Sequence, residues 1–243
     1  MNGSILTTAD RGGENGVKLR LKSIVERIRI AAEKCGRDPS SVRMVAVSKT
    51  QPAETVRKVA ETGGITLLGE NYIQEARDKI EALSDLNLTW HFIGHLQSNK
   101  AKIAVGLFDL IHSVDSVKLA RELSKQAAKI GKTQQILIQV NIGQEASKSG
   151  TMAHTALDLV HQMAALDHIR IRGLMTMPPF FDSPERVRPF FSALRQLRDK
   201  IATETIPGVS MTELSMGMTG DFEAAIEEGA TLVRIGTALF GPR

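Results

Sequence analysis

The sequence alternates between short apolar runs and amphipathic segments, and this repeat limits the possible folds more than any other feature. The apolar runs are rich in Val, Ile and Leu, as strands buried on both faces should be. They cover residues 42–49, 65–70, 89–94, 110–115, 135–141, 169–177, 211–217 and 231–237. Strands that alternate with helices predict a parallel sheet, and this many units in 243 residues favour an α/β fold closed as a (β/α)8 TIM-type barrel. An open doubly wound sheet is the alternative.

A helical pattern precedes the first strand and predicts an extra N-terminal helix. It starts at Val17, and Gly36 is expected to end it. Its apolar stripe comprises Leu21, Ile24, Val25, Ile28, Ala32 and Cys35. Residues 1–16 lack the pattern of a signal or transit peptide and are expected to form a flexible tail, which leaves 17–243 as one barrel domain.

Composition and charge exclude several functional classes. The net charge of +4 comes from basic and acidic residues that are intermixed along the chain, and Trp90 and Tyr72 are the only large stacking side chains besides phenylalanine. Nucleic-acid binding is therefore not expected. No apolar run approaches the roughly 20 residues that span a bilayer, so no membrane association is expected. Cys35 is the only cysteine, which favours a reducing, cytoplasmic location, and a monomer is expected.

In a barrel of this type, the residues that follow the carboxyl ends of the strands form the active face. Lys49 follows the first apolar strand directly. A desolvated amine there has a lowered pKa and can act as a nucleophile, but a lysine at this place can also simply extend to the surface. Strand context alone leaves both readings open.

Two neighbouring turns near the end of the chain are rich in Gly, Ser and Thr. LSMGMTGD and RIGTALFG each join a strand to a helix, where backbone N–H groups and the helix dipole attract a phosphate. They contain the candidates Ser215, Gly217, Gly236 and Thr237. Arg234 lies within the last strand and needs a polar partner there, either a barrel carboxylate or a ligand atom.

Other polar residues give weaker signals. His91 and His95 lack a third ligand at metal-binding spacing, so core or supporting roles are favoured and no metal is expected. Lys148 follows the fifth strand and either belongs to the active face as a second amine or is a solvated loop residue.

Several ordered motifs resemble the pyridoxal phosphate homeostasis protein family, whose members are single-barrel relatives of the alanine racemase N-terminal domain. They are VAVSKT, GENYIQE, WHFIGHLQSNK, HSVDS, RGLMTM and LSMGMTGDFEAAIEEGATLVRIGTALFG. The resemblance extends from about Val42 to Gly241. One departure is Thr219, at a position that usually holds serine; both residues supply a hydroxyl.

The resemblance implies a cofactor and a set of residues that hold it. It implies that Lys49 carries pyridoxal 5′-phosphate (PLP) as a Schiff base, with Asn71 close to the cofactor. Ser215, Gly217, Gly236 and Thr237 would surround the phosphate, and Arg234 would face the pyridine nitrogen. An arginine there keeps that nitrogen unprotonated, which makes carbanion chemistry slow.

Three functions follow as hypotheses. The first is a carrier that buffers or delivers PLP, with apo forms of PLP-dependent enzymes as recipients and no catalytic residues of its own. The second is an amino-acid racemase of fold type III, although the only tyrosine, Tyr72, falls in a predicted helix rather than in a second domain. The third is a barrel enzyme that acts on another phosphorylated metabolite with Lys49 as its amine.

Overall fold

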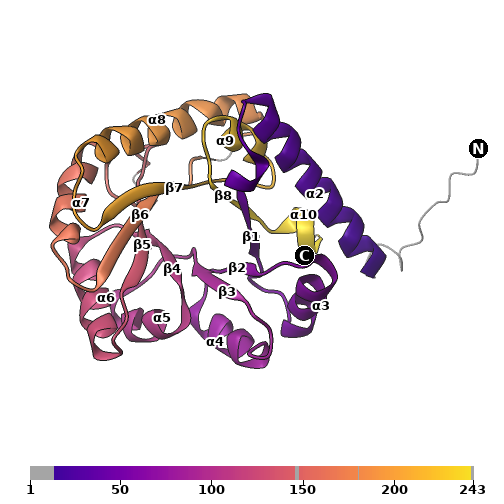
Figure 1. Cartoon of the computed structure of the whole chain (residues 1–243), viewed down its shortest axis with the longest axis horizontal. Helices are drawn as coiled ribbons and strands as arrows, with labels where there is room; N and C mark the ends of the chain where they lie inside the picture. Colours follow the sequence, from indigo (N-terminus) through magenta and orange to yellow (C-terminus); the bar gives the residue numbers. More distant parts are fainter. Residues whose placement is uncertain (1–13, 146–147, 180, 242–243) are drawn as a thin grey trace, which may run out of the picture.

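A computed structural model describes residues 14–145, 148–179 and 181–241, and its centre is a closed parallel barrel (Figure 1). Neighbouring strands pair in sequence order, and β1 also pairs with β8 to close the ring. The strands are β1 (Arg43–Val47), β2 (Leu67–Glu70), β3 (Thr89–Phe92), β4 (Leu110–Val114), β5 (Gln134–Gln139), β6 (Ile169–Met175), β7 (Val209–Met218) and β8 (Leu232–Ile235). The predicted barrel is confirmed and the open sheet is excluded.

Helices follow the strands and surround the barrel (Figure 1). The α-helices are α2 (Glu14–Lys34), α3 (Ala53–Gly63), α4 (Ile73–Ala82), α5 (Ala101–Leu107), α6 (Val117–Lys129), α7 (Ala156–Ala164), α8 (Pro184–Thr203), α9 (Phe222–Glu227) and α10 (Thr237–Phe240). Short 3-10 turns are η1 (Pro39–Ser41), η2 (Ser98–Lys100) and η3 (Ala153–Thr155). Each strand is thus followed by a helix, as the alternating pattern predicts.

The alternation of side chains along each strand produces two cores. Outward-facing residues pack against the helices in one large cluster that includes Ala46, Ile111 and Val233. A smaller cluster fills the barrel interior and contains Val45, Leu110, Leu137, Met175 and Leu232. Because strand residues alternate between the two faces, the residues two positions further along β4 and β8, His112 and Arg234, also belong to the interior. The interior therefore has an apolar layer and a polar layer.

The N-terminal helix α2 completes the ring of helices. The last helix, α10, is only one turn long, and α2 packs against α10, α9 and α3 (Figure 1). Arg20 Nε donates to the carbonyl oxygen of Leu239 at 2.7 Å, and Arg37 Nη1 donates to that of Ile226 at 2.8 Å. The helix therefore covers the part of the barrel wall that a long eighth helix would otherwise cover.

Two details of α2 differ from the sequence prediction. The described part of the helix already includes residues 14–16, which the sequence assigned to the tail; the rest of the predicted tail lies outside the described residues. Val25 and Cys35 are exposed, whereas Val17, Ile24, Ile28, Ala31 and Ala32 are buried. Helical periodicity therefore predicted the centre of the buried stripe correctly, but two residues that it placed in the stripe, Val25 and Cys35, are exposed.

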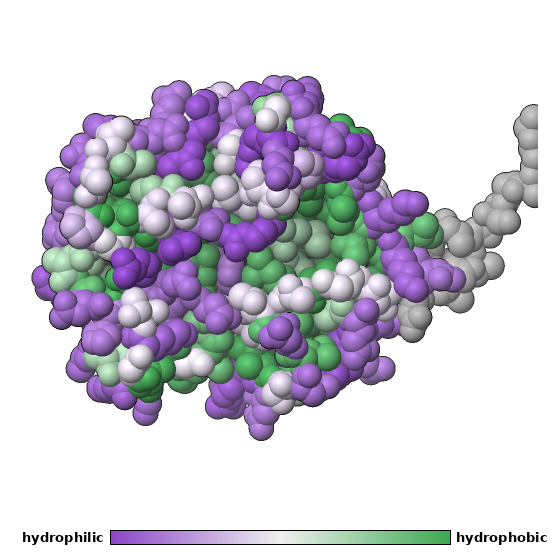
Figure 2. All heavy atoms as spheres, viewed as in Figure 1, coloured by the Kyte–Doolittle hydropathy of each residue, from purple (hydrophilic) through white to green (hydrophobic). Residues whose placement is uncertain are grey.

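The outer surface is mostly hydrophilic. In the space-filling view, hydrophilic residues cover the surrounding helices and hydrophobic residues are visible toward the middle of this face (Figure 2). Among the helices of the described ranges, none combines the length and the apolar character needed to cross a membrane.

Candidate functional site

A cavity of about 330 Å³ opens at the carboxyl ends of the strands. Its lining comes from the ends of β1, β7 and β8 and from the turns that follow β1, β2, β3, β6, β7 and β8, which is where a barrel of this type places its chemistry. The lining residues are Val47, Lys49, Asn71, Ile93, Met177, Phe181, Met218, Thr219, Gly220, Asp221, Arg234, Gly236 and Thr237. Five predicted residues thus meet in one cavity, and Ser215 and Gly217 lie outside its lining.

Lys49 reaches this cavity from a tight turn that follows β1. The preceding residue, Ser48, is fully buried, and Lys49 itself is partly exposed. The following residue, Thr50, has a positive φ of 63°, a conformation that a β-branched residue adopts only under constraint. The turn that places Lys49 in the cavity lining therefore contains, at Thr50, a backbone conformation that the surrounding residues must hold.

Arg234 is held in the barrel interior by two acceptors. Its Nη1 donates to Ser215 Oγ at 2.6 Å, and its Nη2 donates to the carbonyl oxygen of Thr176 at 3.0 Å. The side chain is 4 % exposed, and burial lowers the pKa of the guanidinium to about 10, although the carboxyl of Asp221 opposes this shift. At neutral pH it remains a cation. Its partners are a hydroxyl and a carbonyl, so the predicted barrel ion pair is not what satisfies it.

A chain of hydrogen bonds continues from Arg234 into the barrel. Ser215 Oγ lies 2.9 Å from His112 Nδ1, and His112 Nε2 lies 2.9 Å from His91 Nδ1. Arginine can only donate, so the Ser215 oxygen accepts from Arg234. The direction of the two bonds that involve the histidines depends on which ring nitrogen carries the proton in each. The chain thereby connects the guanidinium to both histidines.

Both histidines are neutral. Burial lowers the pKa of His91 to about 3, with a further contribution from the charge of Arg43. Burial also lowers the pKa of His112 well below its ordinary value, and His91, Arg234 and Arg43 act in the same direction. The supporting role that the sequence favoured for His91 is what the geometry shows, whereas His112 lacked any signal in the sequence.

Gly217 shapes the turn between β7 and α9. It has φ of +89°, and a Cβ atom there would lie 2.5 Å from the Cβ atom of Ala225. The pairing of β7 with β8 shifts register at this point, between the Ser215–Leu232 and Met218–Arg234 pairs. Only glycine allows the chain to bend here so closely to α9. Gly217 therefore brings Met218 and Thr219 to the cavity without lining it.

Gly236 and Thr237 line the cavity directly. Gly236 is the N-cap residue of α10 and Thr237 is its first residue. Across the cavity, Asn71 follows β2, and its Oδ1 atom is buried without a hydrogen-bond partner among the described residues. Buried polar atoms normally have partners, so this amide oxygen is suited to accept a hydrogen bond from a ligand.

Asp221 is a lining residue that the sequence reasoning missed. Its Oδ1 accepts from the backbone N–H of Met218 at 2.6 Å, and burial raises the pKa of the carboxyl. In the motif MGMTGD it resembled an ordinary helix N-cap residue, so no sequence signal separated it from a structural role.

Lys148 and Asn141 lie on the same end of the barrel but outside the cavity lining. Lys148 Nζ donates to the carbonyl oxygen of Pro178 at 3.0 Å, and Asn141 Nδ2 donates to that of Glu145 at 2.8 Å. Lys148 is thus neither a solvated loop residue nor a lining amine: it ties its loop to the loop after β6.

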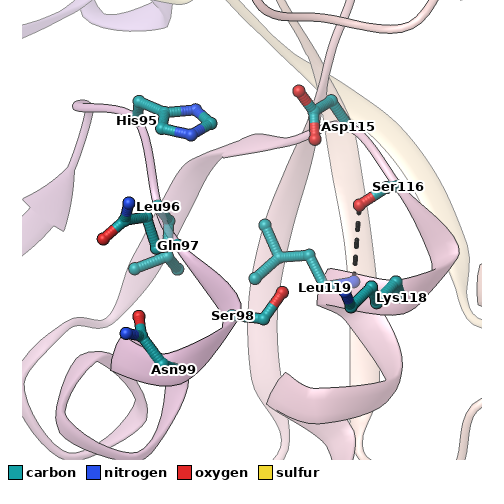
Figure 3. Close-up of a pocket in the computed structure, with 9 residues that line it drawn as sticks. All are labelled: His95, Leu96, Gln97, Ser98, Asn99, Asp115, Ser116, Lys118 and Leu119. Atoms are coloured by element: carbon teal, nitrogen blue, oxygen red, sulfur yellow. Dashed lines mark hydrogen bonds between the residues drawn. The ribbon is translucent and has the colours of Figure 1, made fainter.

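A second, more open cavity lies beside η2 and the start of α6 (Figure 3). His95 and Asp115 lie on opposite sides of it, and Ser116 Oγ accepts from the backbone N–H of Leu119 and caps α6. His95 is exposed, whereas His91 is buried. No group of three His, Cys, Asp or Glu residues able to hold a metal occurs in the described part of the chain.

Comparison with known proteins agrees with this geometry. The family model described as alanine racemase, N-terminal domain, matches residues 19–243. A pyridoxal phosphate homeostasis protein from Aquifex aeolicus is 46 % identical over 224 residues, which cover 92 % of this chain and 97 % of the relative. The chain belongs to the pyridoxal phosphate homeostasis protein family. The family resemblance that the motifs indicated is confirmed.

Solved structures extend the comparison to this family's fold. The structure of PipY from Synechococcus elongatus with PLP bound has a TM-score of 0.78 and 38 % identity, and the match covers 90 % of this chain and 100 % of PipY. An alanine racemase from Clostridium difficile has a TM-score of 0.70 at 16 % identity, and the match covers 92 % of this chain but 57 % of the racemase. At that identity the racemase shares the fold alone.

Proposed function

We propose that this chain binds PLP in the cavity at the carboxyl ends of its strands and buffers or delivers it, with Lys49 as the covalent anchor. The observation that carries the proposal is the convergence of an amine, a buried guanidinium and two Gly/Thr turns around one cavity of about 330 Å³. These groups match the aldehyde, ring nitrogen and phosphate of PLP. The PLP-bound structure of PipY, a relative at 38 % identity, supports the assignment.

Each lining residue has a role in this proposal. The Lys49 amine would hold PLP covalently through its aldehyde. Gly236, Thr237, Thr219 and Gly220 would hold the phosphate, while Ser215 would fix Arg234 and Gly217 would shape the turn that leads to Thr219. Asn71 supplies the amide oxygen that lacks a partner within the described chain.

Arg234 decides how reactive the bound cofactor is. The guanidinium remains a cation at neutral pH, and its anchors on Ser215 and Thr176 fix its position. A cation beside the pyridine nitrogen opposes protonation of that nitrogen, because two positive charges would repel. The ring then withdraws electrons weakly, which suits a carrier better than a fast enzyme.

The racemase alternative gains no support from Tyr72. Tyr72 precedes α4 rather than lying within it, is 58 % exposed, and does not line the cavity. A racemase needs a second acid or base opposite the lysine. Turnover of alanine or serine enantiomers that is lost in Lys49→Ala would favour the racemase. A different phosphoester bound in place of PLP would favour the third hypothesis.

The cellular setting is part of the proposal. We propose a cytoplasmic monomer that passes PLP to apo forms of PLP-dependent enzymes. A single cysteine is consistent with a reducing compartment. Transfer of cofactor to an apo-enzyme, followed by recovery of that enzyme's activity, tests the delivery step.

Replacing Lys49 with alanine tests the anchor. The wild-type protein mixed with PLP is expected to develop visible imine absorbance, and borohydride reduction followed by peptide mapping is expected to place the adduct on Lys49. Lys49→Ala should show neither signal. Lys102→Ala, which changes an exposed lysine of α5, is the matched control and should behave as wild type. An undiminished imine band in Lys49→Ala would disprove the anchor.

A further inference from the structure

The turn that carries Lys49 is held on both sides by a polar cluster formed by the buried residues Ser48, Glu70 and Lys79 and the partly exposed Glu75. Ser48 Oγ donates to Glu70 Oε1 at 2.6 Å, and Ser48 N donates to the carbonyl oxygen of Gly69 at 3.1 Å. Both Ser48 and Glu70 are fully buried. The residue immediately before Lys49 is therefore fixed to the end of β2 through its side chain and its backbone.

Lys79 joins this contact to α4. Its ammonium donates to the carbonyl oxygen of Ser48, to Glu70 Oε1 at 2.7 Å and to Glu75 Oε1 at 2.6 Å. An ammonium has three hydrogens, so these acceptors use all of them. Lys79 is 5 % exposed, which is rare for lysine and occurs where the charge is fully paired.

Glu75 reaches the other side of the turn. Its Oε1 also accepts from the backbone N–H of Thr50, the residue immediately after Lys49. Thr50 has the positive φ described above, and such a conformation persists only when its surroundings hold it. The Glu75 carboxylate thus joins Thr50 to the Lys79 ammonium.

Holding a turn with buried charged groups carries a desolvation cost. Burial raises the pKa of the Glu70 carboxyl, and Glu70 Oε2 has no hydrogen-bond partner in the ranges that the structure describes. Well-packed apolar residues of similar size are often as stabilising as a buried ion pair. What apolar residues cannot supply is a set of directed bonds to the backbone on either side of Lys49. Glu70 also directly precedes Asn71, so the same cluster fixes a second lining residue.

We propose that Glu70, Lys79 and Glu75 are positioning residues that hold the Lys49 turn in the one backbone conformation that directs its amine into the cavity. The proposal rests on the proposed function, because it concerns the amine that anchors PLP. The three residues do not line the cavity and act through Ser48 and Thr50. Loosening the cluster is expected to speed the loss of PLP while leaving the barrel folded.

Three variants of α4 test the proposal. Glu75→Leu removes both the acceptor for Thr50 and the partner of Lys79, Glu75→Gln keeps an amide oxygen that can accept from Thr50, and Glu81→Leu changes an exposed glutamate of the same helix that has no side-chain role in the cluster. PLP release is followed by the decay of the imine absorbance when an excess of a competing amine is added. Amide hydrogen exchange at Thr50 and Gln51 is measured in the protein without PLP.

Glu75→Leu is expected to release PLP about tenfold faster than wild type, as the loss of hydrogen bonds to a charged group implies. Its Thr50 amide should also exchange faster. Glu75→Gln should recover most of both properties, and Glu81→Leu should match wild type. If Glu75→Leu does not fold, the double variant Glu70→Gln/Lys79→Met, which removes the charges together and keeps an acceptor for Ser48, should show the same faster release.

Two outcomes separate this inference from the proposed function. Wild-type release and wild-type exchange in Glu75→Leu would overturn the positioning role while PLP binding stands. A wild-type protein that takes up no PLP would overturn both.

Discussion

At the scale of single residues, the interior of the barrel is polar where it meets the cavity and apolar below. Arg234, Ser215, His112 and His91 form one chain of hydrogen bonds within the interior. Arg234 donates to Ser215, because arginine has no acceptor. The hydrogen-bond partners of the guanidinium are therefore neutral groups, and Asp221, which lines the cavity, is the carboxyl that acts on its charge.

The neutral histidine pair predicts how stability depends on pH. Below about pH 6.5 the histidines of the unfolded chain take up protons, while the folded pKa of His91 is about 3 and that of His112 is also far below its ordinary value. The unfolded state then binds more protons, so the free energy of unfolding falls as pH falls, by up to about 1.4 kcal/mol per pH unit for each histidine. Urea denaturation at pH 7 and pH 5 measures this slope.

The double variant His91→Leu/His112→Leu is the comparison for that experiment. It lacks both buried rings, so its stability should depend less on pH over the same range. Ring signals of His91 or His112 that titrate near pH 6.5 in NMR spectra of the wild-type protein would contradict the neutral pair.

At the scale of elements, strand and helix positions followed from the sequence, but contacts between elements did not. Each of the eight apolar runs overlaps one strand, because a parallel strand buried on both faces has a clear aliphatic pattern, although β7 extends beyond both ends of its predicted run. The cluster of Glu70 and Lys79 joins a strand end to the next helix, and the nine positions that separate them match no helical or strand spacing. Residues such as Asp221 and His112 gain their roles only when the barrel closes.

The sequence identified the cavity better than it identified the function of each residue. Lys49, Asn71, Arg234, Gly236 and Thr237 all line it, because the carboxyl ends of barrel strands converge on one face. Ser215 and Gly217 belong to the LSMGMTGD motif but do not line the cavity. Ser215 contacts Arg234, and Gly217 lies against α9. The motif alone therefore does not show which of its residues line the cavity. The register shift in β7, between Ser215 and Met218, determines this.

The turn between β7 and α9 gives a prediction at this scale. Gly217→Ala would place a methyl group 2.5 Å from the Cβ atom of Ala225 at φ of +89°. We expect the free energy of unfolding to fall by about 2–3 kcal/mol or more, and PLP affinity to fall with it, since overpacking and backbone strain add. Thermal and urea denaturation with PLP titration measure both effects.

Gly106→Ala is the control for that substitution. Gly106 lies in α5 with no atom close to the position of an added Cβ, so alanine there should stabilise the protein by about 0.5–1 kcal/mol. A Gly217→Ala protein as stable as wild type would show that the turn can move away from α9.

At the scale of the whole molecule, α2 is part of the barrel rather than an appendage. Ile24 is 2 % exposed and packs in the large core, whereas its neighbour Val25 is 52 % exposed. The helix contacts α3, α9 and α10, so its apolar stripe seals the wall beside β1 and β8.

A matched pair of substitutions measures this contribution. Ile24→Ala should lower the free energy of unfolding by about 2–5 kcal/mol, because it leaves a cavity between α2 and the barrel. Val25→Ala, one position along, should change it by less than about 0.5 kcal/mol. Equal effects of the two substitutions in urea denaturation would show that α2 does not pack as described.

The contact between α2 and the last helix has a consequence for how the protein is made. The hydrogen bond from Arg20 to Leu239 joins residues 219 positions apart, so α2 finds this partner only when the end of the barrel has been translated. Until α9 and α10 have been translated, only α3, among the α-helices that α2 contacts, is available to cover part of its buried stripe, and such long-range contacts slow folding and leave apolar surface open to aggregation. Nascent chains stalled before β8 should therefore depend on chaperones more than the released protein does.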